Sequence, residues 1–93
     1  MTRILKPTRQ YKRDLKRYRH DADLISTLTK VISDLAADIP LKASVRDHDL
    51  HNNWEGCREC HVKPDVLLVY RKTDGEIHVL LLERLGSHSN LFG

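Results

Sequence analysis

Two apolar runs on either side of a turn signal constrain the fold of this chain more than any other feature. Residues 66–70 read Val-Leu-Leu-Val-Tyr, residues 79–82 read Val-Leu-Leu-Leu, and Asp74-Gly75 lies between them. Asp-Gly between apolar runs is the strongest short signal for a β-hairpin. A hairpin this apolar must be covered, so the rest of the chain has to supply elements that pack on it.

A third strand precedes this hairpin. Residues 57–63 alternate polar and apolar side chains between Gly56 and Pro64. We therefore expect an antiparallel meander of three strands, over residues 57–63, 66–72 and 76–85. If Asp74 and Gly75 form a two-residue turn, counting back along the strands places Asp65 opposite Arg84.

The N-terminal part of the chain predicts a short strand and a helix. Residues 4–5 are apolar and precede Pro7, which is typical of an edge strand. Thr8 is placed to cap a helix that runs to about His20.

A second helix is expected next, capped by Asp21 or Asp23 and ended by Pro40. Residues 41–56 are polar and irregular, so they predict a loop, with a short strand near residues 44–46. The apolar residues of this helix recur at helical spacing: Leu24, Leu28, Val31, Ile32, Leu35 and Ile39.

Together these elements predict one α+β domain over residues 1–93. Its N-terminal strand, helical hairpin and meander sheet would place both helices on one face and leave the other open. The chain has 93 residues, 40% hydrophobic and 31% charged. Its apolar runs are far shorter than the ~18 residues of a membrane span, and no export signal is evident. We expect a cytoplasmic protein with no membrane partner.

Positive charge is concentrated at the N-terminus. Residues 1–20 hold eight Lys or Arg against Asp14 alone, a net charge of +7, whereas the whole chain has a net charge of only +3. Such a basic pole favours contact with a polyanion or an acidic protein, although a simply solvated helix face has the same pattern. The candidate contact residues are Lys12, Arg13, Lys16 and Arg17.

Cys57 and Cys60, followed by His61, match the CxxCH pattern that attaches c-type haem. On a strand the two cysteines point to opposite faces, so they can neither share a haem nor form a disulfide with each other. We expect two reduced thiols, with Cys60 toward the core and His61 toward the open face. A zinc site built from His48, His51, Cys57 and His61 remains an alternative.

Three histidines are placed for acid–base chemistry. His48 and His61 lie on either side of the loop before the meander, His88 follows the last strand, and Asp65 and Arg84 lie nearby. Such a set suits cleavage of RNA by its own 2′-hydroxyl group, in which one group accepts a proton and another protonates the leaving oxygen. The residues alone leave other acid–base reactions open.

Three ordered blocks resemble the YafQ branch of the RelE/ParE toxin superfamily. They are residues 47–50 (DHDL), 54–65 (WEGCRECHVKPD) and 84–92 (RLGSHSNLF). The resemblance implies a RelE/ParE-like fold and the toxin of a type II toxin–antitoxin system. It also implies a ribosome-dependent endoribonuclease that cuts mRNA in the A site, arrests translation and needs no metal or cofactor.

The same resemblance implies which residues carry out the reaction. His61 and Asp65 match positions for proton transfer at the attacking hydroxyl group. His88 matches an acid or phosphate contact, and His48 a proton-transfer or positioning group. Arg84 matches a phosphate-binding arginine.

The resemblance also implies substrate contacts and binding partners. Phe92 would stack on a base, whereas Trp54 is expected to be structural. Some relatives have tryptophan where this chain has Val66, which leaves codon preference open. Expected partners are mRNA, the ribosome and a DinJ-like antitoxin whose acidic segment covers the basic surface.

The competing interpretations are a non-catalytic toxin of the same fold that poisons DNA gyrase and a zinc-binding module. Three further histidines match no functional position and are expected to be dispensable: His20, His51 and His78.

Overall fold

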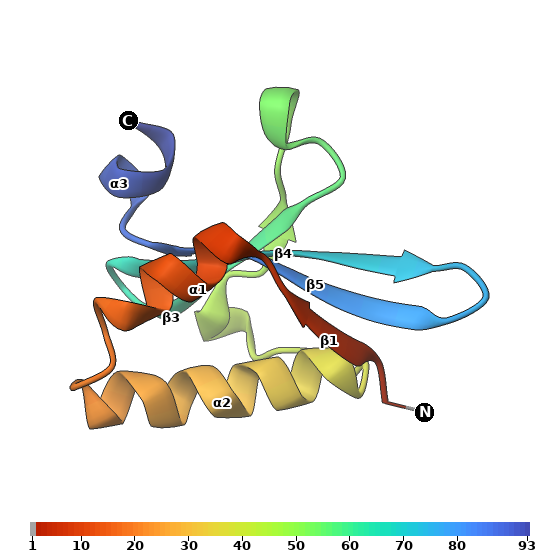
Figure 1. The fold of residues 1–93 in the computed structure, drawn as a ribbon, viewed down its shortest axis with the longest axis horizontal. Coiled ribbons are helices and arrows are strands. Elements are labelled where there is room, and N and C mark those ends of the chain that lie inside the picture. The colour runs from red at the N-terminus through yellow and green to blue at the C-terminus, as the bar shows by residue number, and fades with distance from the viewer. Residues whose placement is uncertain (1) are drawn as a thin grey trace.

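The computed structural model describes residues 2–93, apart from the side chain of Asn52. A mixed five-stranded sheet has the order β1-β5-β4-β3-β2, with β1 parallel to β5 and the other pairs antiparallel (Figure 1). The predicted α+β class is therefore confirmed. The elements are β1 (Ile4–Pro7), α1 (Arg9–Lys16), α2 (Ala22–Ala36), η1 (Ala43–Val45), β2 (His48–Asp49), η2 (Asn52–Trp54), β3 (Arg58–Lys63), β4 (Val66–Asp74), β5 (His78–Gly86) and α3 (His88–Phe92).

Side-chain caps begin both N-terminal helices, as predicted. The Thr8 hydroxyl accepts a hydrogen bond from the amide of Tyr11 at 3.0 Å, and the Asp21 carboxylate accepts one from the amide of Leu24 at 3.1 Å. Each cap satisfies an amide that the first helical turn leaves without a backbone partner.

Both helices end earlier than predicted. α1 stops at Lys16 instead of about His20, and α2 stops at Ala36, ahead of Pro40. The end of α2 is set by Asp38, whose φ of 58° is left-handed and breaks the helical path. Ile39 is consequently 51% exposed and does not belong to the core.

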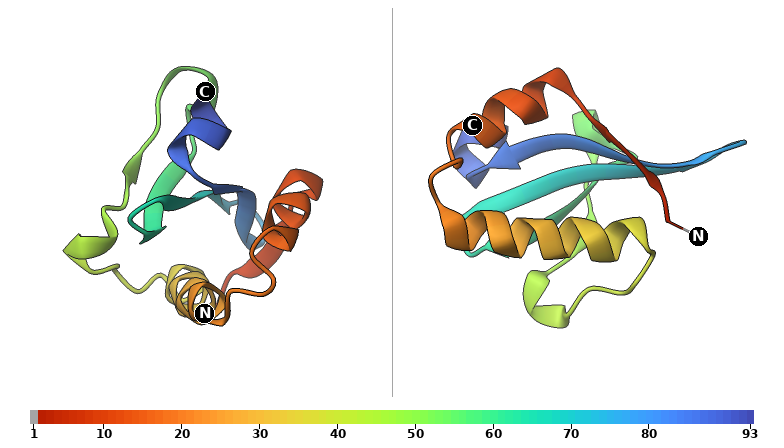
Figure 2. Two further views of the ribbon diagram at one scale, coloured as in Figure 1. Left: turned by 90° about the vertical axis from the view of Figure 1, so that its left-hand side faces the viewer. Right: turned by 60° about the horizontal axis from the view of Figure 1, so that its bottom comes forward.

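The main core lies between α2 and one face of the sheet (Figure 2). The buried leucines and valine of α2 follow the helical spacing predicted for its apolar face. Tyr11 brings α1 against the same core from the β5 side. On the sheet this face is formed by Cys60, Val62, Val66, Leu68, Tyr70, Leu80, Leu82 and Leu85.

The opposite face is not left open as predicted. A second apolar cluster of Cys57, Leu67, Val69 and Leu91 lies there, because α3 and the segment around Trp54 cover part of the sheet (Figure 2). The alternation of the CxxCH segment is confirmed, since its two cysteines belong to clusters on opposite faces and neither forms a disulfide. Cys57, however, is buried in this second cluster rather than lying on a polar face.

The predicted hairpin register is wrong. Asp74 pairs with His78, so three residues connect β4 and β5, and a β-bulge lies between Val69 and Tyr70. The longer turn shifts the predicted pairing by three residues, and the bulge, which leaves Glu83 without a direct partner, shifts it by one more, so Arg84 lies opposite Val69 and not opposite Asp65. The short strand predicted near residues 44–46 is also misplaced, since η1 occupies that position and β2 follows it.

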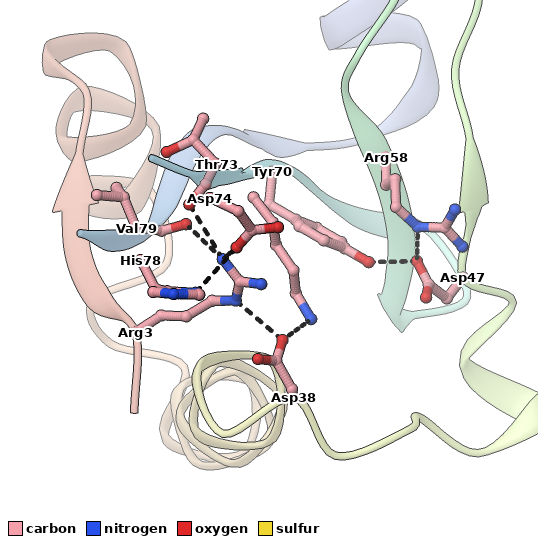
Figure 3. Close-up of polar contacts among 10 residues, drawn as sticks. Arg3, Asp38, Asp47, Arg58, Tyr70, Thr73, Asp74, His78 and Val79 are labelled. Atoms are coloured by element: carbon pink, nitrogen blue, oxygen red, sulfur yellow. Dashed lines mark hydrogen bonds and ion pairs between the residues drawn. The ribbon is translucent and has the colours of Figure 1, made fainter. Parts of the chain in front are cut away.

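A buried arginine joins the N-terminus to the hairpin (Figure 3). Arg3 contacts the carboxylates of Asp38 at 2.9 Å and Asp74 at 2.7 Å, and it donates to the carbonyl of Thr73. Hydrogen bonds from Lys72 and Arg3 hold the pKa of Asp38 down at about 2. This network connects β1, the end of α2 and the β4–β5 hairpin.

Two further findings concern residues 2–93. Their helices are all too short or too polar to cross a membrane. No three His, Cys, Asp or Glu side chains among them come together as a metal site, so the set proposed for zinc is not gathered.

Candidate active site

His48 and Glu59 form a pair at the edge of the sheet. They are register partners in β2 and β3, and the Nε2 atom of His48 lies 2.7 Å from a carboxylate oxygen of Glu59. The Nδ1 atom of His48 lies 2.9 Å from the carbonyl oxygen of Arg46. Because a carbonyl only accepts, Nδ1 donates to Arg46, and the distance between Nε2 and Glu59 is that of a hydrogen bond. The pair therefore fixes the orientation of the imidazole at this edge of the sheet.

Glu59 is the site residue that sequence reasoning missed. Its residue surface is only 4% exposed, and its second carboxylate oxygen has no hydrogen-bond partner among the described residues. Strand alternation alone places Glu59 on the same face as His61. The burial of Glu59, however, depends on the segments that cover this face, and the strand pattern does not reveal it.

His61 lies two residues further along β3, on the same side of the strand as Glu59. It is half-buried and lines a hollow of about 410 Å³ with Arg46 and Lys63. Its register partner is Leu67 in β4, whose own partner in β5 is Gly86. Two inter-strand spacings, about 10 Å, therefore separate the backbone of His61 from that of Gly86, the last residue of β5 before α3.

Asp65 is exposed in the tight connection between β3 and β4. Burial raises the pKa of Tyr18, and the negative charges of Asp65 and Asp14 add to this increase. Asp65 therefore lies on the side of the molecule that carries the end of α1.

Arg84 is held by the one acidic residue of the basic helix. Its Nε atom donates to Asp14 at 2.7 Å and its Nη2 atom donates to the other carboxylate oxygen at 3.2 Å. The Asp14 hydrogen bond raises the pKa of Arg84. The Asp14 carboxylate also accepts the amide of Leu85 at 3.0 Å. Arg84 is therefore fixed in orientation, with 23% of its side chain still exposed.

α3 carries the last two candidates. Ser87 caps this short helix by accepting from the amide of Asn90 at 3.2 Å, which sets His88 at its first position. The rings of His88 and Phe92 lie 4.9 Å apart, and Phe92 meets Trp54 edge to face at 5.4 Å. His88 is exposed, whereas Phe92 is half-buried.

The basic residues predicted for RNA contact are all exposed on α1 or at its end. Through Asp14 this helix is attached to β5 immediately before α3. The structure thus brings His48, Glu59 and His61 together on β2 and β3, and His88 with Phe92 on α3. Asp65 and the basic residues Lys12, Arg13, Lys16 and Arg17 lie at the side of this group.

Comparisons with known proteins agree on one family. Residues 3–93 match the family model described as the bacterial toxin of a type II toxin–antitoxin system, YafQ. The chain is 38% identical over 88 residues to the mRNA interferase toxin YafQ of Escherichia coli K12, covering 90% of this chain and 89% of that protein.

Solved structures are similar over nearly their whole length. The E. coli DinJ–YafQ toxin–antitoxin complex contains a chain that is 34% identical, with a TM-score of 0.85 and full coverage of both chains. A metal-bound toxin from Helicobacter pylori is 38% identical, with a TM-score of 0.86, covering 99% of this chain and 100% of that chain.

Proposed function

Since the chain belongs to the YafQ family of type II toxin–antitoxin toxins, we propose that it is an endoribonuclease that cuts mRNA on the ribosome. Its E. coli relative is named an mRNA interferase. The observation that carries the proposal is the His48–Glu59 pair with His61 beside it and His88 on the facing helix. Imidazole is the side chain most often used as a general acid or base, and carboxylates also serve in this role.

The proposed reaction uses the substrate's own 2′-hydroxyl group. A side chain removes its proton, the 2′-oxygen attacks the adjacent phosphorus, and the bond from phosphorus to the 5′-oxygen breaks. A second side chain protonates the departing 5′-oxygen. The products are a 2′,3′-cyclic phosphate and a free 5′-hydroxyl group, and the protein supplies two proton transfers and charge stabilisation.

We assign the proton transfer at the 2′-hydroxyl group to His61 and Asp65. His88 donates to the leaving oxygen or contacts the phosphate, from α3, which follows the end of β5 two strands away from His61. The hydrogen-bonded His48–Glu59 pair positions the 2′-hydroxyl group or takes part in its proton transfer.

Arg84 stabilises the charge that develops on the phosphate. Its orientation is set by the bidentate contact with Asp14, which leaves the rest of its guanidinium free to donate. Phe92 stacks on a base of the substrate, where a single stacking contact is worth ~1–3 kcal/mol.

The exposed basic face of α1 contacts ribosomal RNA in this proposal. Charge reversal at Lys12, Arg13, Lys16 and Arg17 should abolish co-sedimentation with ribosomes at moderate salt. Binding of the unmodified protein should fall steeply with salt, because each phosphate contact releases counterions. If the charge-reversed protein co-sediments as well as the original, this part of the proposal is wrong.

The same face is the proposed docking surface for a cognate antitoxin. In the E. coli complex YafQ is bound to DinJ. An acidic segment of a DinJ-like antitoxin complements the net charge of +7 on residues 1–20 and would block ribosome binding.

The proposal is tested by inducing the protein in a growing bacterium while mRNA 5′ ends and translation are followed. The unmodified protein should create new mRNA ends and arrest translation, whereas His61→Ala, His88→Ala and Asp65→Ala should lose both effects. His20→Ala is the matched control, because its imidazole is exposed and accepts a hydrogen bond from the neighbouring Arg19, outside the residues assigned to the reaction. Toxicity without new mRNA ends would instead favour a non-catalytic toxin such as a gyrase poison, as would full toxicity in all three variants.

A further inference from the structure

A hollow next to the proposed catalytic residues differs in chemistry from the rest of the site. It has a volume of about 380 Å³, within the usual range for small-molecule sites. Its walls come from α3 and the segment around η2. These two segments lie on the face of the sheet opposite α2 (Figures 1 and 2). Its lining residues are Leu50, His51, Asn53, Trp54, His88, Leu91 and Phe92.

The lining combines apolar and uncharged polar side chains and has no permanently charged group. Two aromatic rings and two leucines provide apolar walls, while His51, Asn53 and His88 offer hydrogen-bond donors and acceptors. Among the described residues that line it there is no Lys, Arg, Asp or Glu, although these types make up 31% of the chain. Such a lining suits a flat, uncharged ligand with polar edges and offers no cationic group to hold a phosphate.

The walls are preformed. The segment that contains His51 and Trp54 is closed by a backbone hydrogen bond from Leu50 to Cys57 at 2.9 Å, and another joins Cys57 to Trp54 at 2.9 Å. On the other side Leu91 is buried against the sheet, where it packs over Gly86. The edge-to-face contact between Trp54 and Phe92 joins the two walls.

We propose that this hollow binds one nucleobase of the cleaved RNA, and that His51 and Trp54 help to select it. The proposal rests on the ribonuclease function, because His88 lines the hollow and also serves the reaction. The base stacks on the aromatic wall, and His51 with Asn53 reads its polar edge. His51, which the sequence alone gave no reason to retain, is therefore a specificity residue.

Binding can be measured without any cleavage. In ¹H–¹⁵N spectra of the purified protein, uncharged nucleosides are titrated first, and inorganic phosphate is titrated separately. Nucleosides should produce saturable shifts at the Trp54 indole N–H and at the amides of Asn53 and Leu91, whereas phosphate should leave these signals in place. His51→Ala should weaken the best nucleoside by ~5-fold or more, about 1 kcal/mol, and the exposed control His20→Ala should leave it unchanged.

A second measurement addresses selectivity. Ribosome-bound mRNAs that differ by one base at each position around the cut are compared for the original protein and His51→Ala. We expect the variant to cleave its best substrate more slowly and to discriminate less between bases. Nucleoside shifts that are absent, that lie outside the hollow or that phosphate reproduces would overturn the proposal, as would an unchanged base preference in His51→Ala. If the protein cleaves no RNA at all, the nucleoside titration still decides whether the hollow binds a base.

Discussion

Replacing Asp14 by alanine should destabilise the protein far more than replacing the basic residues around it. The Asp14 side chain is only 7% exposed and accepts three hydrogen bonds, two from Arg84 and one from the amide of Leu85. Alanine would leave the buried Leu85 amide without a partner, at a cost of ~1–3 kcal/mol. It would also leave Arg84 without its carboxylate, although this side chain is exposed enough to regain some water.

The expected total is a loss of about 3 kcal/mol in the free energy of unfolding, or roughly 12–24 °C in Tm for a chain of this length. Asp14→Asn should lose only about half as much, because its amide oxygen can still accept the Leu85 amide. Arg13→Ala is the matched control on the same helix. It removes an exposed charge and should change the free energy of unfolding by less than ~0.5 kcal/mol.

Urea unfolding measures the loss in the free energy of unfolding for each of these variants. The series includes Arg84→Ala alone and combined with Asp14→Ala. The double-mutant cycle should give a coupling energy of about 1.5–3 kcal/mol between Asp14 and Arg84. A loss below ~1 kcal/mol for Asp14→Ala, or strictly additive single variants, would refute the reasoning.

Three further predictions concern other parts of the fold. The folded-state pKa of Asp38 is about 2, below its ordinary value of 3.8, so its contribution to stability is present above pH ~4 and lost as the pH falls toward 2. Urea titrations should show this loss, and Asp38→Asn should lack it; an identical pH profile would contradict the prediction. Gly86→Ala places a Cβ atom 3.3 Å from the Leu91 side chain. This variant should displace α3, reduce mRNA cleavage and lower the free energy of unfolding by ~1–3 kcal/mol. The control Gly75→Ala places its Cβ atom within 4 Å of no other atom and should leave cleavage intact. Burial raises the pKa of the Cys60 thiol to about 12, so a thiol reagent at pH 8 should label Cys60 only after unfolding, and labelling of the native protein by mass spectrometry would argue against this burial.

The sequence predicted correctly those structural features that depend on interactions between residues close together in the chain. The caps at Thr8 and Asp21, the three strands of the meander and the opposite faces of Cys57 and Cys60 all follow from short-range periodicity and capping chemistry. The resemblance of three sequence blocks to the YafQ branch led to the same family as the comparisons.

Long-range contacts account for what the sequence did not predict. The contact between Asp14 and Arg84 joins residues 70 positions apart, and no local pattern marks such a partner. The longer turn and the bulge between β4 and β5 together changed the expected position of Arg84, because each additional residue shifts every pairing beyond it. Glu59 is buried through the packing of neighbouring segments, so its role beside His48 emerges only from the folded chain.

We propose that this protein cuts ribosome-bound mRNA by attack of the substrate's own 2′-hydroxyl group. The most direct measurement compares two mRNAs on programmed ribosomes that differ only at the nucleotide preceding the cut, which carries either a 2′-hydroxyl or a 2′-deoxy group. We predict that the ribonucleotide substrate gives a product ending in a 2′,3′-cyclic phosphate and that the deoxy substrate is not cut at this position. Equal cleavage of both substrates would contradict the mechanism, because attack would then have to come from another nucleophile.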